Sequence, residues 1–189
     1  MNIIQLLQSI TQNKNNGMLN PIVNPAYTQE ERNKPVNTPK PTPAPVSKNG
    51  QMYGRNPDTV NANPDITNAI KQATQKFNIP TALLFDIAMA ENSLQTSGKS
   101  TDPRSTATGA FQFNDPTWET VLNYARNPEM SLYGVLPNED RNDPVTNALA
   151  AAYLIKFGQL GRWDASKGNW GKFWPDEELN KLGLYNQSK

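Results

Sequence analysis

Apolar side chains recur at helical spacing from about residue 66 onward. Residues 66–77 carry an apolar stripe that repeats every three to four positions, and Asp65 stands before it as a residue suited to cap a helix. Four further helices are expected, each opened by a proline or an aspartate. They begin near Pro80, Asp115, Asp143 and Asp176. Strand-like alternation is not sustained anywhere, so the pattern predicts a mainly α fold.

The first 64 residues differ in composition from the rest of the chain. They hold nine of the sixteen prolines, whereas residues 65–189 hold all four tryptophans. Five prolines lie between Pro35 and Pro45, which indicates an extended, polyproline-like spacer. We therefore expect a disordered or extended N-terminal arm, in which residues 14–64 are a Pro/Asn-rich linker, followed by one α domain over residues 65–189.

Residues 1–13 carry Ile3, Leu6, Leu7 and Ile10 on one face of a short helix. This pattern predicts a docking peptide that lays its apolar face on a partner. The alternative is a terminal segment without a binding role. No basic residue precedes these apolar positions, so a secretory signal is not expected, and no apolar run reaches the ~18 residues of a membrane span.

Composition restricts the chemistry. The chain has no cysteine and no histidine, which excludes Ser-His-Asp and Cys-His triads and the common zinc motifs. Proton transfer in an enzyme of this composition must then come from Asp, Glu, Lys or Tyr, or from a bound metal. Carboxylates are the leading candidates, and we expect neither a cofactor nor a metal. The net charge is +1, and the expected domain carries more acidic than basic residues, so nucleic acid is not an expected partner.

Glu91 breaks the apolar pattern of the second helix. It follows Leu84, Ile87 and Ala88 by seven, four and three residues, which places its carboxyl on the stripe of core side chains. Burial raises the pKa of a carboxyl group, and a carboxyl that is protonated near neutral pH is suited to act as a general acid. The alternative is a helix-terminal glutamate that reaches past the core into solvent.

Three motifs follow one another around this glutamate. Asn92–Ser93 and a polar loop lead to the turn Gly109-Ala110-Phe111-Gln112-Phe113, then to Pro116-Thr117-Trp118, and a later helix begins Asp143-Pro144-Val145-Thr146-Asn147. Their order over roughly residues 66–158 resembles the lytic transglycosylase and goose-type lysozyme superfamily. The stretch from Ser105 to Phe113 is similar to its phage-encoded branch.

The resemblance implies a lysozyme-like α domain that cleaves the bond between N-acetylmuramic acid and N-acetylglucosamine in peptidoglycan. It implies that Glu91 is the catalytic acid and base, and that Gln112 lines the cleft beside Phe111 and Phe113, so these three are substrate-binding candidates. Ser93 would take the place of the family's motif serine, displaced by one position because Asn92 intervenes.

The sequence departs from the family after the Asp-Pro helix, where a Tyr-Asn pair is usual. The only such pair is Tyr185–Asn186 near the end of the chain, and Tyr153 is the competing candidate, with a core position as its alternative. Trp163 and Trp170 are candidates for stacking on sugar rings, or for closing the core.

Asp102 and Asp115 are the candidates for a second carboxylate, which a hydrolytic glycosidase normally uses. Each also has a structural interpretation, Asp102 as part of a turn before Pro103 and Asp115 as a helix cap.

A peptidoglycan lytic transglycosylase with a single Glu acid/base is therefore the expected function. A hydrolytic muramidase and a non-catalytic glycan-binding or structural module are the alternatives. The docking peptide and linker favour a phage virion component that opens the cell wall locally during genome ejection, in the host periplasm or wall. Its expected partners are the glycan strand and, through residues 1–13, other virion proteins. An endolysin is the alternative.

Overall fold

The computed structural model describes residues 53–185. The docking peptide expected in residues 1–13, and the expected linker as far as residue 52, lie outside the described residues. Within the described part the protein is mainly helical, as the sequence predicts, and its only β pairings are three isolated bridges. No helix in this part is long and apolar enough to cross a membrane.

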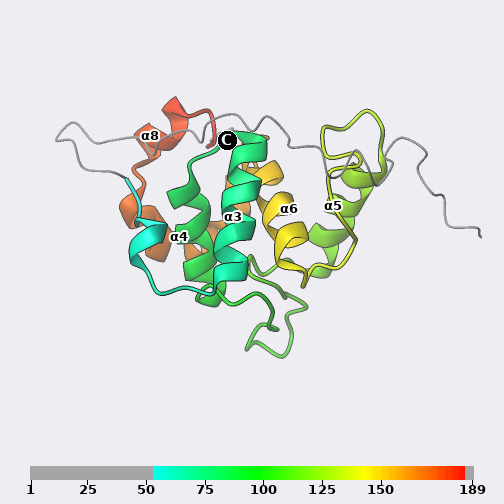
Figure 1. Ribbon diagram of the computed structural model, residues 1–189, viewed down its shortest axis with the longest axis horizontal. Helices are drawn as coiled ribbons and strands as arrows, with labels where there is room; N and C mark the ends of the chain where they lie inside the picture. Colours follow the sequence, from blue (N-terminus) through cyan, green and yellow to red (C-terminus); the bar gives the residue numbers. More distant parts are fainter. Residues whose placement is uncertain (1–52, 186–189) are drawn as a thin grey trace, which may run out of the picture. The chain divides into compact units, whose positions relative to one another are not determined.

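Four helices make up the centre of the domain (Figure 1). They are α3 (Pro64–Phe77), α4 (Thr81–Asn92), α5 (Asp115–Arg126) and α6 (Pro144–Lys156). Short helical segments flank them: η1 (Pro57–Thr59), η2 (Leu160–Ser166), α7 (Lys167–Trp170), η3 (Gly171–Phe173) and α8 (Asp176–Lys181). The five helices expected within residues 65–189 are thus all present.

Polar side chains fix where three of these four helices, α3, α5 and α6, begin. The Asn63 side chain accepts a hydrogen bond from the Asp65 backbone N–H at 2.9 Å, so Asn63 caps α3 in place of Asp65. In the same way Asn114, not Asp115, caps α5. Asp143 caps α6 as expected, with Oδ1 2.8 Å from the Thr146 nitrogen. A proline follows in the first turn of each helix, where its missing N–H costs nothing.

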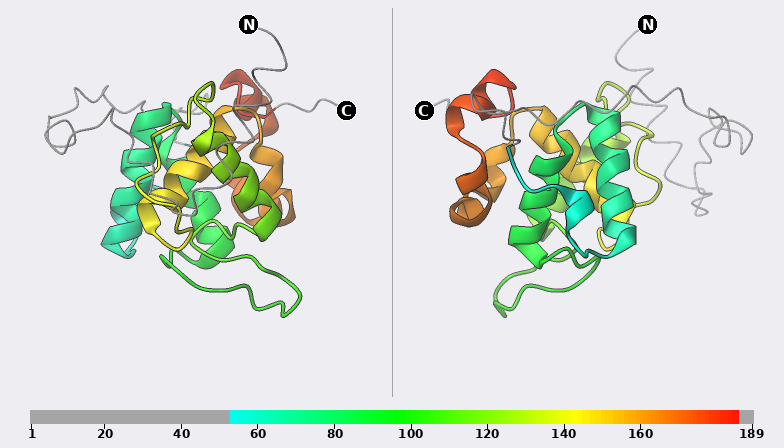
Figure 2. Two further views of the ribbon diagram at one scale, coloured as in Figure 1. Left: turned by 90° about the vertical axis from the view of Figure 1, so that its right-hand side faces the viewer. Right: turned by 60° about the vertical axis from the view of Figure 1, so that its left-hand side comes forward.

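Helix α4 is buried from Ala82 to Ala88. It contacts α3 on one side and the segments η2 and α7 on another, while α3 also packs along α6 (Figures 1 and 2). This explains why α4 and α6 are apolar around most of their circumference, whereas α3 has one polar face.

The aromatic segment after α6 completes the core. Trp170 and Trp174 have 0% and 1% of their surface exposed, and Trp163 has 4%. This segment, coloured orange to red, lies against α4 in the views of Figure 2. Its tryptophans are therefore primarily core residues, and they hold the short helices η2 and α7 against the end of α4 that carries Glu91.

A buried carboxylate ties the beginning of the described chain to this core. Asp86 on α4 accepts hydrogen bonds from the Trp174 indole N–H at 3.0 Å and from the Arg55 backbone N–H at 3.2 Å. The Arg55 Nε lies 3.7 Å from the second carboxylate oxygen, which has no hydrogen-bond partner among the described residues. Burial raises the pKa of Asp86, and the Trp174 and Arg55 contacts oppose that rise.

Gly54 makes this contact possible. Its φ is +79°, and a Cβ atom there would lie 2.8 Å from the Ala82 Cβ and 2.9 Å from Trp174. Residues 53–63, which the sequence analysis assigned to the linker, thus include side chains packed on the domain.

We expect Trp174→Phe to lower the free energy of unfolding at neutral pH by about 1.5–3 kcal/mol, because the Asp86 carboxylate loses a charge-assisted hydrogen bond. Trp170→Phe is the matched control, since that indole donates to the uncharged Trp163 carbonyl, and its loss should cost about 0.5–1.5 kcal/mol. Urea unfolding measures both. The difference should shrink in acid, where Asp86 is protonated, and equal losses at neutral pH would contradict this role of Asp86.

Candidate active site

The Glu91 side chain lines a small pocket of about 70 Å³. Four parts of the chain form it: the last turn of α4, the turn at residues 111–114, the first turns of α5, and η2. Its lining residues are Glu91, Phe111, Gln112, Phe113, Asn114, Thr117, Arg162 and Trp163. The structure thus brings together five residues that the sequence analysis singled out, among them the predicted acid Glu91 and the turn residue Gln112.

Glu91 has the electrostatics expected of a general acid. Burial raises its pKa above the ordinary value, and a hydrogen bond with the Ser166 side chain opposes the rise. Desolvation is the larger effect, since it disfavours the charged carboxylate. No positive charge contributes to the shift among the described residues. The carboxyl therefore keeps its proton to a higher pH than a glutamate in water.

Ser166 suits both protonation states of Glu91. Its hydroxyl lies 3.1 Å from the Trp163 carbonyl oxygen, which also receives the Trp170 indole N–H at 3.0 Å. A hydroxyl has one proton to donate and lone pairs to accept. When Glu91 is protonated, Ser166 can accept its proton and donate to Trp163. When Glu91 is ionised, Ser166 can donate to the carboxylate, because the Trp170 indole still satisfies the Trp163 carbonyl.

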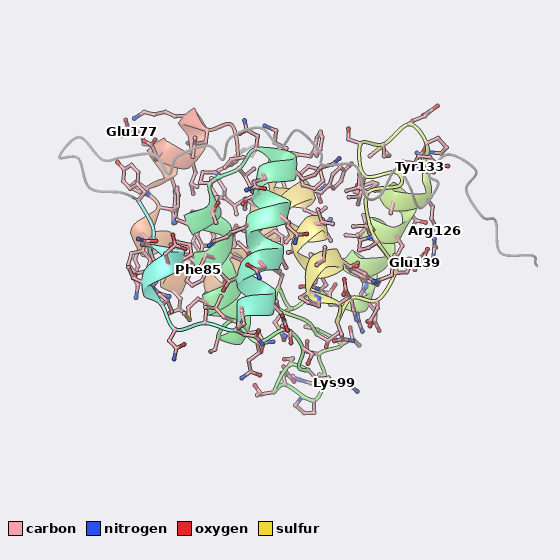
Figure 3. All side chains as sticks on the ribbon, in the orientation of Figure 1. Phe85, Lys99, Arg126, Tyr133, Glu139 and Glu177 are labelled. Atoms are coloured by element: carbon pink, nitrogen blue, oxygen red, sulfur yellow. The ribbon has the colours of Figure 1, made fainter. Side chains whose placement is uncertain are left out.

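The turn that carries Gln112 is held by backbone geometry. Thr108 and Phe113 exchange two backbone hydrogen bonds of 3.1 Å, and Gln112 lies between them with φ of +50°. The Gln112 Nε2 donates to the Gly109 carbonyl at 2.8 Å and to the Gly98 carbonyl at 3.0 Å. Gln112 therefore links the turn to the long loop after α4, whose residue Lys99 is labelled in Figure 3.

Asn147 on α6 supports this turn from behind. Its Oδ1 accepts the Phe111 backbone N–H at 2.9 Å, and its Nδ2 donates to the Arg141 carbonyl at 2.7 Å. Gly109 passes close by with φ of +81°, and a Cβ atom there would lie 2.5 Å from the Arg141 oxygen. Only glycine fits at position 109, which accounts for the glycine of the Gly-x-x-Gln turn. The two Asn147 hydrogen bonds account for the asparagine of the Asp-Pro-x-x-Asn helix.

Trp163 forms the aromatic wall of the pocket. Its indole N–H donates to the Phe111 carbonyl at 3.1 Å, and its ring meets Phe113 edge to face with centroids 5.9 Å apart. These contacts fix the orientation of the indole relative to the Gln112 turn. The edge of Trp163 is thus available to the pocket while most of the ring belongs to the core.

Three aromatic candidates do not line the Glu91 pocket. Tyr153 is 2% exposed and packs among the rings of Phe77, Tyr124 and Phe157, so it occupies the core position weighed as its alternative. Trp170 has no exposed surface on which a sugar ring could stack. The Tyr185 hydroxyl contacts Lys167 at 3.1 Å and Asp164 at 3.3 Å.

Ser93 and the two aspartates also lie outside the Glu91 pocket. Ser93 ends α4 in the left-handed conformation and lines a separate pocket beside Asn61–Asn63. Asp102 is on the exposed loop and pairs with Arg104 at 3.1 Å, which holds the pKa of Asp102 below its usual value. Asp115, in the first turn of α5, pairs with Arg141 at 2.6 Å.

Four site residues were not among the sequence-based candidates: the lining residues Asn114, Thr117 and Arg162, and Ser166, which contacts Glu91. Ser166 follows no recognisable motif, and only its packing against Glu91 reveals it. Arg162 had a usable signal, because it stands directly before Trp163 in the segment that departs from the family pattern. No group of three or more acidic side chains that could hold a metal forms within residues 53–185.

The Transglycosylase SLT domain family matches this chain over residues 68–167, which spans the Glu91 pocket from α3 to η2. Neither the curated proteins nor the solved structures include a match. Because the matched region is more than half of the chain, the protein belongs to the SLT transglycosylase domain family, which has a lysozyme-like fold. Membership supports a lytic transglycosylase-type activity with peptidoglycan as the substrate.

We expect Ser166→Ala to raise the pKa of Glu91 further, because the carboxylate loses a hydrogen-bond donor while its burial persists. Titration of the ¹³C-labelled Glu91 carboxyl by NMR measures this directly and needs no assumption about activity. Ser93→Ala is the matched control and should leave the titration unchanged. A pKa that stays the same or falls in Ser166→Ala would contradict the assigned contact.

Proposed function

We propose that the protein is a peptidoglycan lytic transglycosylase in which Glu91 acts first as general acid and then as general base. The observation that carries this proposal is a partly buried glutamate, with a raised pKa, that opens into a pocket between the Gln112 turn and Trp163. The family match supports the substrate class, and the burial of Glu91 at the pocket supports its choice as the acid.

In the first step, protonated Glu91 gives its proton to the oxygen that links N-acetylmuramic acid to N-acetylglucosamine. The bond from the anomeric carbon to that oxygen breaks, and its electron pair stays on the departing N-acetylglucosamine. In the second step, the Glu91 carboxylate removes the proton of the muramyl 6-hydroxyl as that oxygen bonds to the anomeric carbon. The product is a 1,6-anhydro sugar, Glu91 regains its proton, and no water is consumed.

Ser166 supports this double role. An acid that becomes a base within one turnover needs a neighbour that tolerates both forms, and the Ser166 hydroxyl offers an acceptor to one and a donor to the other. A fixed cation in its place would stabilise only the carboxylate and would lower the pKa of the acid. Ser166 is therefore a positioning residue, and Glu91 is the catalytic residue of the proposal.

The other pocket residues favour attack by the sugar hydroxyl over attack by water. Glu91 is the one carboxylate among the described residues that line the pocket. Hydrolytic glycosidases normally have a second carboxylate within ~5–9.5 Å of the first. The two candidates for that role, Asp102 and Asp115, each pair with an arginine outside the pocket lining.

We expect Glu91→Gln to lower activity on purified peptidoglycan by about 10²- to 10⁴-fold, the usual contribution of a general acid–base group. Mass spectrometry of the digest should find anhydro-muropeptides with the parent chain and very few with Glu91→Gln. Asp102→Asn and Asp115→Asn are the matched controls, and both should retain activity of the parent's order. Circular dichroism checks that each variant is folded.

Other outcomes of that digest assign other functions. Reducing-end sugars in place of anhydro sugars would identify a hydrolytic muramidase and overturn the single-carboxylate mechanism. Loss of activity in Asp102→Asn or Asp115→Asn would do the same. No cleavage by the folded parent chain, on walls of several chemotypes, would favour a non-catalytic glycan-binding or structural module.

We propose further that the protein is a phage virion component that opens the wall locally during genome ejection. The support is in the sequence: the Ser105–Phe113 stretch is similar to the phage-encoded branch, and an apolar helical pattern in residues 1–13 precedes a proline-rich spacer. Other virion proteins would be its partners, and the host periplasm or cell wall its place of action.

Leu6→Asp should remove the protein from assembled virions, because it places a charge on the apolar face of the expected docking helix. Immunoblots of purified particles measure incorporation, and the free chain should keep its activity on peptidoglycan. Gln8→Asp, which adds the same charge on the polar face, is the matched control and should be incorporated normally. Full incorporation of Leu6→Asp would defeat the docking prediction.

A further inference from the structure

Arg162 differs from every other arginine in residues 53–185. Four of the five arginines there lie within 4.0 Å of a carboxylate. The pairs are Arg55 with Asp86, Arg104 with Asp102, Arg126 with Glu119 and Glu139, and Arg141 with Asp115. Figure 3 labels one such pair, Arg126 and Glu139, beside α5. Within the described part of the chain, Arg162 has no carboxylate partner.

Arg162 is nevertheless held in place, by neutral acceptors. Its Nε donates to the Gln159 side-chain oxygen at 2.7 Å, and its Nη1 donates to the Thr117 hydroxyl at 3.2 Å. These partners come from different parts of the chain, Gln159 directly before η2 and Thr117 in the first turn of α5. The guanidinium is therefore fixed between two elements without being neutralised by either.

Much of the hydrogen-bonding capacity of Arg162 faces no partner. A guanidinium has five N–H donors in a planar fork, and the two contacts use two of them. The side chain is exposed and lines the same pocket as Glu91. A fixed, uncompensated guanidinium at a pocket is suited to bind a carboxylate in two parallel hydrogen bonds.

We propose that Arg162 binds a carboxylate on the peptide stem of the substrate and makes the enzyme selective for glycan strands that still carry their stems. The inference rests on the proposed function of the Glu91 pocket. The sugar rings of an N-acetylated glycan are neutral, so the carboxylates that such a cation can meet belong to the peptide attached to the muramyl unit. That unit is the one whose bond Glu91 would cleave, which places the stem close to the pocket.

The test uses the full chain and three preparations of one peptidoglycan: native strands, strands whose stem carboxylates are methyl-esterified, and strands stripped of stems by an amidase. The stripped strands are methyl-esterified as well, because amidase cleavage leaves a lactyl carboxylate on the muramyl unit. Esterification removes charge while keeping the bulk of the stem. Arg162→Gln should lower kcat/KM on native strands by about 10- to 100-fold, the effect of losing a charge-assisted pair of hydrogen bonds. On esterified and stripped strands it should change kcat/KM by less than about 2-fold.

Two further variants sharpen the comparison. Arg162→Lys keeps the charge but not the planar fork, so it should lie between the parent and Arg162→Gln on native strands. Arg104→Gln removes an exposed arginine outside the Glu91 pocket and should behave like the parent on all three preparations. Added salt should weaken the parent's preference for native strands.

The substrates also separate the two levels of proposal. Activity on stripped strands shows that Arg162→Gln is folded and competent. Equal losses on native, esterified and stripped strands would overturn the inference and leave Arg162 as a link between α5 and η2. A parent chain that cleaves none of the three preparations would instead overturn the proposed function itself.

Discussion

The burial of α4 is the constraint around which this domain is organised. The helix is buried on every side from Ala82 to Ala88, with Asp86 as the one polar side chain among these residues, and it is enclosed by α3 on one side and by η2 and α7 on another. Its last turn emerges from that enclosure at Glu91. The carboxyl is consequently desolvated enough for its pKa to rise, yet it still borders a pocket. The position of this helix end therefore determines both the burial of α4 and the raised pKa of Glu91.

The aromatic segment after α6 gives the pocket its second side. Trp163, Trp170 and Trp174 are buried through their rings and satisfied through their indole N–H groups, which donate to Phe111, Trp163 and Asp86 respectively. The contacts of Trp163 and Trp170 join the Gln112 turn to the Trp163 carbonyl that Ser166 also contacts, while Trp174 separately ties the segment to Asp86. The segment contains only the short helices η2, α7 and η3, so these side-chain contacts are what attach it to the rest of the domain.

The sequence predicted most of the fold because helix-forming patterns are local. Apolar stripes and prolines placed the central helices, although the caps of α3 and α5 proved to be the asparagines one or two positions earlier than expected. Glu91 and Gln112 were predicted because a break in periodicity and a motif marked them, and Trp163 because a tryptophan can stack on a sugar ring. Ser166 and Arg162 were not, because their roles depend on contacts between segments far apart in the chain, such as the 45 residues that separate Arg162 from Thr117. Tyr153 was a candidate for the pocket but is buried in the core, because the sequence alone does not distinguish an aromatic ring of the core from one that lines a pocket.

Asp86 and Glu91 place two carboxyls with raised pKa values on one buried helix. In the unfolded chain both carboxyls have ordinary pKa values, whereas in the folded domain both pKa values are raised, so the carboxyls stay protonated to a higher pH. The free energy of unfolding therefore falls as pH rises from the unfolded pKa through the folded pKa, and below both values the two groups contribute no pH dependence. Selection for heat resistance alone would thus favour the removal of the Glu91 charge. At Asp86 such a change would loosen the attachment of Arg55, whereas at Glu91 it would yield a sturdier protein that had lost its proposed acid.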